Sequence, residues 1–205
     1  MRPEDVNMCA GYGTDILGFV VEFPRPVPWN ITRTAARELI AAVNGPAQTC
    51  VVTSGPPEQV LPIARATKPD YLQLHGNETV AATACLVSEL GRAGIKIIKT
   101  VFPTTPDLVK TAADYCATGI YALLLDPRTP DNAVHGGAAD LSIFSRLQQA
   151  VNCPLILAGG ITPDNVAKLV RQAKPQIIDL MTGVEHCPGV KDDAKVRALF
   201  KALAP

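Results

Sequence analysis

Two pairs of small residues, Gly159-Gly160 and Thr182-Gly183, follow short apolar runs in the last quarter of the 205-residue chain. Glycine lets backbone N–H groups approach an anion closely, and the N-terminus of a following helix would add partial positive charge. In parallel β/α barrels, the turns after the last two strands commonly bind phosphate. Either pair alone could be a tight turn without a ligand, but the two together predict a phosphate-binding site.

Asp126 ends another apolar run, directly after Leu124 and Leu125. A carboxyl group buried at a strand end would have a raised pKa, which suits it to donate a proton. The alternative is that Asp126 only caps the following turn, which contains Pro127 and Pro130. The residues by themselves favour neither interpretation.

His75 closes a further apolar run and is one of only three histidines. A single histidine is more often a structural hydrogen-bonding residue than an acid or base. The segment Ala133–Ala139, which contains Gly137, is typical of a mobile loop that could cover a ligand. These residues are candidates for binding a substrate near Asp126.

Strands must position these residues, and seven apolar, β-rich runs predict them. The runs are Asp15–Val21, Thr49–Thr53, Tyr71–His75, Lys96–Val101, Tyr121–Asp126, Pro154–Ala158 and Ile177–Thr182. Most lack strict alternation, which is typical of strands covered on both faces. Helical patterns separate them, so the repeat is β–α and the predicted sheet is parallel.

Helix boundaries are visible at several points. Thr32 can cap a helix through Val43, and Thr162-Pro163 supplies an N-cap and a first-turn proline for a helix through Gln172. The last helix, Asp192–Leu203, begins with two acids at its positive end. A helix over Pro3–Gly11 precedes the first strand.

The predicted fold is a single-domain (β/α)8 TIM barrel of the phosphate-binding type, over residues 1–205. A closed barrel of ordinary shear needs eight strands, and the pattern supplies seven. We therefore expect the N-terminal strand to be missing from these residues. Two sheet edges would then be exposed and could pair with another chain, so a homo-oligomer is possible.

Composition narrows the function classes. Nineteen basic residues balance nineteen acidic ones, so no net charge favours nucleic acid or an anionic membrane. No apolar run is long enough to span a bilayer, and the N-terminus lacks a signal-peptide pattern, which predicts a cytoplasmic protein. No cysteines form a C-x-x-C pair, so we expect no zinc site and six unpaired, mostly buried thiols. They are Cys9, Cys50, Cys85, Cys116, Cys153 and Cys187.

Several motifs together resemble the phosphoribosylanthranilate isomerases, a family of the tryptophan pathway. The matching segments run in order along the chain: Arg2–Asp5, Asp15–Val20, Leu72–Glu78, Leu123–Asp126, Gly136-Gly137, Leu157–Val166 and Asp179–Asp192. The resemblance implies an Amadori rearrangement of N-(5-phosphoribosyl)anthranilate. That reaction needs one general acid and one general base, and no metal or redox cofactor.

The resemblance also implies residue roles. Asp126 matches the family's general acid, which protonates the ring oxygen of the sugar. Gly160 and Gly183 fall in the phosphate-binding turns, together with Gly159 and Thr182. His75 is assigned to shaping the substrate pocket. Gly137 lies in the flexible loop over the substrate, where this chain has Gly-Gly-Ala-Ala in place of Gly-Gly-Thr-Gly.

The family's general base does not match any residue of this sequence. It is a cysteine in a Lys-x-Cys-Gly motif, on a strand just before the segment that matches Arg2–Asp5. Cys9 lies within the predicted first helix, with no room for a strand and crossover before Gly18. The base stays unidentified, and we expect residues 1–205 alone to turn over poorly. A translation start placed too late is the favoured explanation.

The anthranilate end of the site also departs from the family pattern. The family has Ser-Pro-Arg after the second strand, and its arginine contacts the substrate carboxylate. Here the segment is Phe23–Trp29, where Val27 takes the aligned place and Arg25 could serve from a shifted position. Two alternatives therefore stay open. One is a relative with another phosphosugar substrate and Glu22 as base, and the other is a non-catalytic phosphosugar-binding protein.

Overall fold

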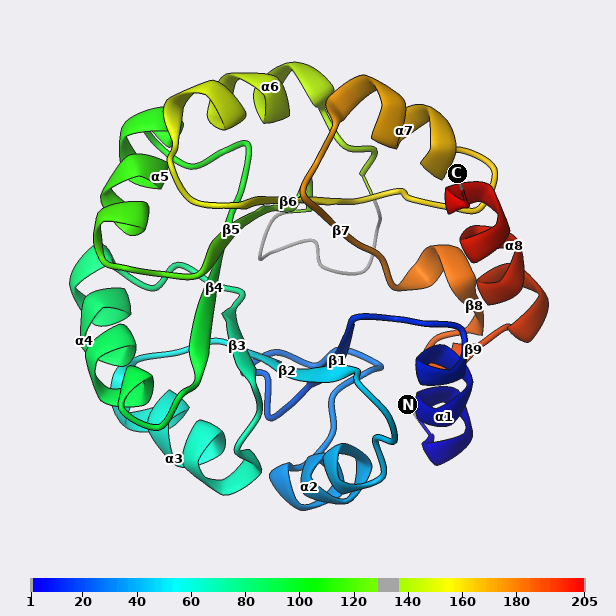
Figure 1. The fold of residues 1–205 in the computed structure, drawn as a ribbon. Coiled ribbons are helices and arrows are strands. Elements are labelled where there is room, and N and C mark those ends of the chain that lie inside the picture. The colour runs from blue at the N-terminus through cyan, green and yellow to red at the C-terminus, as the bar shows by residue number, and fades with distance from the viewer. Residues whose placement is uncertain (1, 129–136, 205) are drawn as a thin grey trace.

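A computed structural model of the chain describes residues 2–128 and 137–204. Seven parallel strands form one curved sheet in chain order, and helices cover its outer face (Figure 1). Six of these strands lie inside the predicted runs and β2 begins one residue before its run, which confirms the barrel fold class and the seven strands expected for the described residues. The strands are β1 (Ile16–Val20), β2 (Gln48–Thr53), β3 (Tyr71–Leu74), β4 (Lys96–Val101), β5 (Ala122–Leu125), β6 (Leu155–Ala158) and β7 (Ile177–Asp179).

Eight α-helices in the described residues alternate with these strands. They are α1 (Pro3–Gly11), α2 (Arg33–Ala41), α3 (Pro57–Thr67), α4 (Val80–Gly91), α5 (Leu108–Ala117), α6 (Leu141–Ala150), α7 (Val166–Ala173) and α8 (Asp193–Leu203). A 3₁₀ turn, η1 (Thr182–Val184), and a short antiparallel pair, β8 (Glu185–Cys187) and β9 (Val190–Lys191), precede α8. None of the helices described is both long and apolar enough to cross a membrane.

Two predicted boundaries were wrong. Thr32 does cap α2, because its side chain accepts a hydrogen bond from the Ala35 N–H at 3.2 Å. Thr162, however, does not cap α7, which begins four residues later at Val166. Residues 162–165 form a turn instead, closed by a bond from the Thr162 N–H to Asn165 Oδ1 at 2.9 Å. The last strand also ends early, because Thr182 starts the 3₁₀ turn rather than finishing β7.

The sheet is open between its first and last strands. Among the strands described, β1 pairs only with β2 and β7 only with β6, and Figure 1 shows the gap between them beside α1 and α8. A cavity of about 740 Å³ extends from the barrel interior into this gap. Ile31 covers one end of the β1 edge, since its N–H donates to Val20 O and its carbonyl accepts from the Glu22 N–H, each at 3.0 Å.

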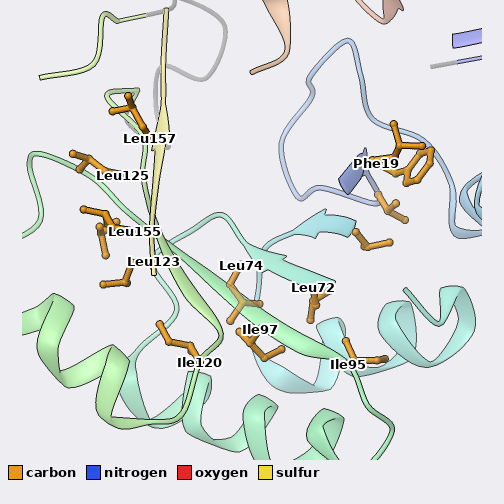
Figure 2. Packing of buried hydrophobic residues seen from close by; sticks show 14 of the residues in the cluster. Phe19, Leu72, Leu74, Ile95, Ile97, Ile120, Leu123, Leu125, Leu155 and Leu157 are labelled. Carbon is orange, nitrogen blue, oxygen red and sulfur yellow. The ribbon is translucent and has the colours of Figure 1, made fainter. Parts of the chain in front are cut away.

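Apolar side chains on the two faces of the sheet form separate clusters. The larger cluster lies between strands and helices and includes Leu72, Leu123 and Leu157, each without exposed surface (Figure 2). The smaller one fills the barrel interior and includes Ile98 and Leu124. Burial on both faces explains why the strands read as continuous apolar runs. Burial on both faces also fixes the positions of the strand ends, which carry the residues of the candidate site.

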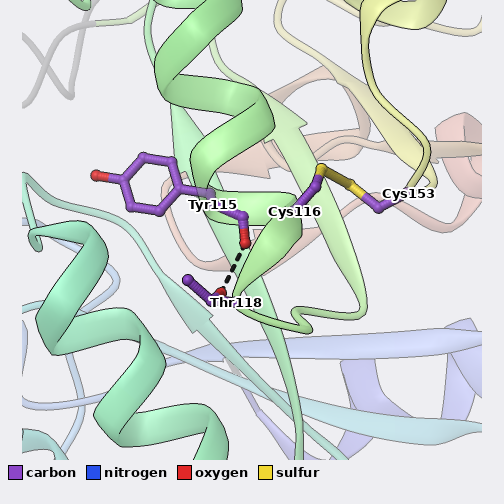
Figure 3. The surroundings of a disulfide bond; sticks show 4 residues. All are labelled: Tyr115, Cys116, Thr118 and Cys153. Carbon is purple, nitrogen blue, oxygen red and sulfur yellow. Dashed lines mark hydrogen bonds between the residues drawn. A yellow bond between two sulfur atoms is a disulfide. The ribbon is translucent and has the colours of Figure 1, made fainter.

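One cysteine prediction was wrong. Cys116, at the end of α5, forms a disulfide with Cys153, just before β6 (Figure 3). The two residues are 37 positions apart in sequence, so only the fold brings them together. Among the free thiols, Cys9 and Cys50 are buried as expected, and a further two, at positions 85 and 187, are exposed.

Reduction of this disulfide is expected to lower the free energy of unfolding by about 3–4 kcal/mol, because the bond restricts a long loop of the unfolded chain. Urea unfolding with and without reductant measures the change. The double variant Cys116→Ser/Cys153→Ser should lose this response, whereas Cys85→Ser/Cys187→Ser should keep it. Equal stability of the oxidised and reduced chains would contradict the prediction.

Candidate functional site

Asp126 lies at the carboxyl end of β5, inside the barrel and with no exposed surface. His75 follows β3, and its Nε2 is 3.3 Å from Asp126 Oδ2. Arg128 folds back on the same carboxylate, with its Nη2 2.6 Å from Oδ2 and its Nε 3.0 Å from Oδ1. The fold therefore brings together the two strand-end residues predicted from the sequence, and adds an arginine.

The pKa of Asp126 differs from the expectation. Burial alone would raise it, as the sequence suggested. The hydrogen bond from His75 and the bonds and charge of Arg128 outweigh burial, and they hold the pKa of this carboxyl well below its usual range. Asp126 is thus ionised at neutral pH in this arrangement, and it must gain a proton before it can act as an acid.

The ring of His75 is held in one orientation. Its Nδ1 lies 2.9 Å from Gln73 Nε2 and 3.2 Å from Thr100 Oγ1. The Gln73 amide N–H can only donate, so Nδ1 accepts and the proton of a neutral ring sits on Nε2. That proton faces Asp126. Phe23 and Phe102 each pack at an angle to the imidazole.

Asp179, at the end of β7, is a site residue that the sequence reasoning missed. It lines the same cavity as His75 and Arg128. Surrounding protein atoms and the charge of Asp126 raise its pKa, although the residue is exposed. Its position at a strand end was the available signal, but the predicted strand ran on to Thr182.

The two glycine turns lie against each other. Gly159 and Gly160 have φ values of +97° and +62°, which favour glycine. A Cβ at Gly183 would lie 1.9 Å from the carbonyl oxygen of Ile161, so the turn after β6 and the turn at Thr182 are in direct contact. Sequence reasoning placed both turns at one end of the barrel, and the structure brings them together there.

Gly137 and Ala138, which follow the predicted loop residues 133–136, lie directly against the turn at Gly159 and Gly160. A Cβ at Gly159 would lie 3.1 Å from the Gly137 carbonyl oxygen, and one at Gly160 would lie 3.3 Å from Ala138 Cα. Gly137 therefore sits beside the predicted phosphate turn. The rest of the predicted loop, residues 133–136, lies outside the described residues.

Arg25 lies outside the main cavity. It lines a neighbouring pocket of about 460 Å³, together with Ser54 and Gly55. This pocket shares Phe23 and His75 with the main cavity. Arg25 is therefore close to the site, at the end of the barrel where the sequence placed it.

The two substitute bases considered from the sequence are both constrained. Cys9 is buried in α1, and burial raises the pKa of its thiol. Arg33 forms an ion pair with Glu22 at 2.5 Å and lowers the pKa of that carboxyl. Glu22, which follows β1, is therefore held by Arg33 of α2 rather than directed at a substrate. No group of His, Cys, Asp and Glu among the described residues could hold a metal ion.

Comparison with known proteins decides the family. A family model described as N-(5'-phosphoribosyl)anthranilate (PRA) isomerase matches residues 14–202. The chain belongs to the phosphoribosylanthranilate isomerase family. It is therefore similar to isomerases of tryptophan biosynthesis across nearly its whole length, and the resemblance seen in the sequence motifs is confirmed.

Individual phosphoribosylanthranilate isomerases are similar to this chain in sequence and in fold. The enzyme of a Bradyrhizobium species is 35% identical over 98% of this chain and 90% of its own length. The crystal structure from Thermus thermophilus matches with a TM-score of 0.83 and 32% identity, over 99% of this chain and 94% of that one. A second solved isomerase, in complex with reduced 1-(o-carboxyphenylamino)-1-deoxyribulose 5-phosphate, has the same fold, with a TM-score of 0.80 and 24% identity over 98% and 93% of the two chains.

Proposed function

We propose that this chain converts N-(5-phosphoribosyl)anthranilate from an aldose to a ketose, with Asp126 as the general acid, and that residues 1–205 do so slowly because no residue among them matches the family's cysteine base. The observation that carries the proposal is the place of Asp126. It is fully buried at a strand end and directly contacts His75 and Arg128, which both line the cavity. A catalytic acid must lie within reach of the ring oxygen and away from bulk water.

The glycine turns would bind the phosphate group of the substrate, at the end away from the ring oxygen that Asp126 protonates. Gly159, Gly160, Thr182 and Gly183 would hold the phosphate through backbone N–H groups. Gly137 would approach the substrate from the loop above them. This assignment leaves the anthranilate ring on the side of the barrel where His75 and Phe23 lie.

The ion pair between Asp126 and Arg128 adds one requirement to this chemistry. A carboxylate held by a guanidinium cannot donate a proton. The acid role therefore requires the pair to separate when substrate binds, so that Asp126 takes up a proton and passes it to the ring oxygen. Arg128 is 18% exposed in its side chain and lies on the cavity wall, which leaves it a path away from Asp126.

The proposal is tested by two measurements on the chain. Trp29 is the only tryptophan and lines the cavity, so its fluorescence reports binding of the reduced product analogue. Chromatography of the substrate and product then measures isomerisation. Saturable binding with measurable conversion supports the proposal, whereas absence of binding at millimolar analogue would oppose it.

A non-catalytic phosphosugar-binding protein is the second candidate, and it differs in a single outcome. It would bind the analogue without conversion, and Asp126→Asn would change neither result.

Self-association through the free edges of β1 and β7 stays a prediction, which sedimentation velocity of residues 1–205 tests.

Arg25→Leu is expected to weaken binding of the reduced product analogue by about 10- to 100-fold. This is the effect of losing a charge-assisted hydrogen bond to the carboxylate of the analogue's anthranilate group. The same substitution at Arg37, an exposed residue of α2, is the matched control and should leave binding unchanged. Fluorescence titration of both variants decides the point. Unchanged affinity in Arg25→Leu would remove Arg25 from the site.

The low pKa of Asp126 predicts a pH dependence of stability. A carboxyl whose pKa is lower in the folded state contributes stability above its unfolded pKa of about 3.9, and that contribution is lost as the pH falls through the folded value. The wild-type chain should therefore lose more stability than Asp126→Asn on acidification below pH ~4. Urea unfolding across this range measures it, and parallel curves would contradict the assignment.

A further inference from the structure

A buried ion pair lies close behind the proposed site. Lys99 of β4 has its Nζ 2.9 Å from Glu78 Oε2, and each side chain is only 1% exposed. Glu78 comes from the loop between β3 and α4. Breaking a buried pair is costly, yet replacing both members with apolar residues is often neutral or stabilising. Stability alone therefore does not account for a pair at this position.

Lys99 binds the backbone on both sides of His75. Its Nζ donates to the carbonyl oxygen of Gly76 at 2.7 Å, and the carbonyl oxygen of Leu74 lies at 3.4 Å. It also donates to the carbonyl oxygen of Thr100 at 2.8 Å. Leu74 and Gly76 are the chain neighbours of His75, so one ammonium group fixes the backbone that carries the imidazole.

Glu78 completes the arrangement from the other side. Its Oε1 accepts hydrogen bonds from Ser54 Oγ at 2.7 Å and from the Gly55 N–H at 3.2 Å. Its Oε2 accepts from the Gly76 N–H at 3.2 Å. A Cβ at Gly76 would lie 1.9 Å from Ser54 Oγ. The ends of β2, β3 and β4 are therefore tied to one pair of charges.

Thr100 connects this pair to the ring of His75. Its carbonyl oxygen binds Lys99, while its hydroxyl lies 3.2 Å from His75 Nδ1. The opposite nitrogen of the ring is 3.3 Å from Asp126 Oδ2. Lys99 thus binds the backbone on either side of His75 directly, and it also binds Thr100, which shares the contact to the ring with Gln73.

We propose that Lys99 and Glu78 are positioning residues, which hold the imidazole of His75 on Asp126 and thereby set the acid for turnover. The inference rests on the proposed role of Asp126 in isomerisation. It assigns to the pair a function in aligning the site, without contact between Lys99 or Glu78 and the substrate.

The decisive variant is Glu78→Leu/Lys99→Met, which removes both charges together and leaves neither buried alone. The chain has only three histidines, so the His75 ring signals can be assigned by NMR with His75→Gln as reference. We expect the Nε2–H proton of His75 to exchange faster with water in the variant. We also expect kcat to fall by about 10- to 100-fold, as a displaced catalytic group would cause, while KM stays nearly unchanged.

The matched control is Lys110→Met/Asp114→Leu, which removes an exposed ion pair from α5. It should alter neither the His75 signal nor kcat. A folded double variant at Glu78 and Lys99 with wild-type His75 exchange and wild-type kcat would overturn the proposal. Should that variant fail to fold, the nearly isosteric Glu78→Gln takes its place. The His75 exchange rate and kcat are expected to change in the same way, and wild-type values of both would overturn the proposal.

The NMR result separates this inference from the proposed function. If the wild-type chain shows no isomerisation, the proposed function fails. The exchange rate of the His75 Nε2–H still reports whether the ion pair positions the ring, because it requires no turnover.

Discussion

Asp126→Asn is expected to lower isomerase turnover by about 10³-fold, or to the detection limit, while the reduced product analogue still binds. An asparagine keeps the shape of the side chain and can still accept the His75 N–H, but it cannot carry and release a proton. The loss should therefore appear in kcat and not in the affinity for the analogue. Chromatographic turnover and Trp29 fluorescence measure the two quantities separately.

A surface carboxylate provides the control for this variant. Asp114→Asn makes the same chemical change on α5, where the side chain is 43% exposed and pairs only with a lysine on the same helix in the described contacts. It should leave turnover and binding as they are in the wild type. If Asp126→Asn turns over at the wild-type rate, the proton must come from another group, and Asp179, with its raised pKa, would be examined next.

The strand-end residues were predictable because they depend on local patterns. An apolar run that ends in Asp126 or His75 fixes where the side chain lies once the sheet is parallel and curved. The glycine turns were found in the same way, from residue type and position. The open sheet was also predictable, because seven runs cannot close a barrel of ordinary shear, and the described sheet is open between β1 and β7.

The features that the sequence did not reveal depend on contacts between distant segments, or on a chain that turns back on itself. One of the two interpretations of Asp126 expected burial to raise its pKa, but His75 and Arg128, which turns back from only two residues away, bind the carboxylate and lower the pKa instead. The Cys116–Cys153 disulfide joins parts of the chain that only the barrel brings together. Lys99 lies in an apolar strand, and nothing near it in sequence indicates a buried partner. Such pairings follow from the packed fold and not from spacing.

Gly183→Ala is expected to have the second largest effect, on phosphate binding. The new Cβ would lie 1.9 Å from the Ile161 carbonyl oxygen and 3.0 Å from its carbonyl carbon. Both atoms belong to the backbone, so the clash cannot be relieved by a rotamer change, and the turns at Gly160 and Gly183 must move apart. Overpacking of this kind costs about 1–3 kcal/mol. If the same displacement separates the phosphate-binding N–H groups, affinity should fall by about 10- to 100-fold.

The choice of ligand separates lost phosphate contacts from general damage to the fold. We expect Gly183→Ala to weaken binding of the reduced product analogue, while the dephosphorylated analogue binds to the variant and the wild type equally. Gly91→Ala is the matched control, because no atom lies within 4 Å of the added Cβ at the end of α4. It should bind both ligands normally and gain up to about 1 kcal/mol in stability. Equal weakening of both ligands in Gly183→Ala would mean that the turns shape the cavity without binding phosphate, because a phosphate contact can be lost only by a ligand that carries the group.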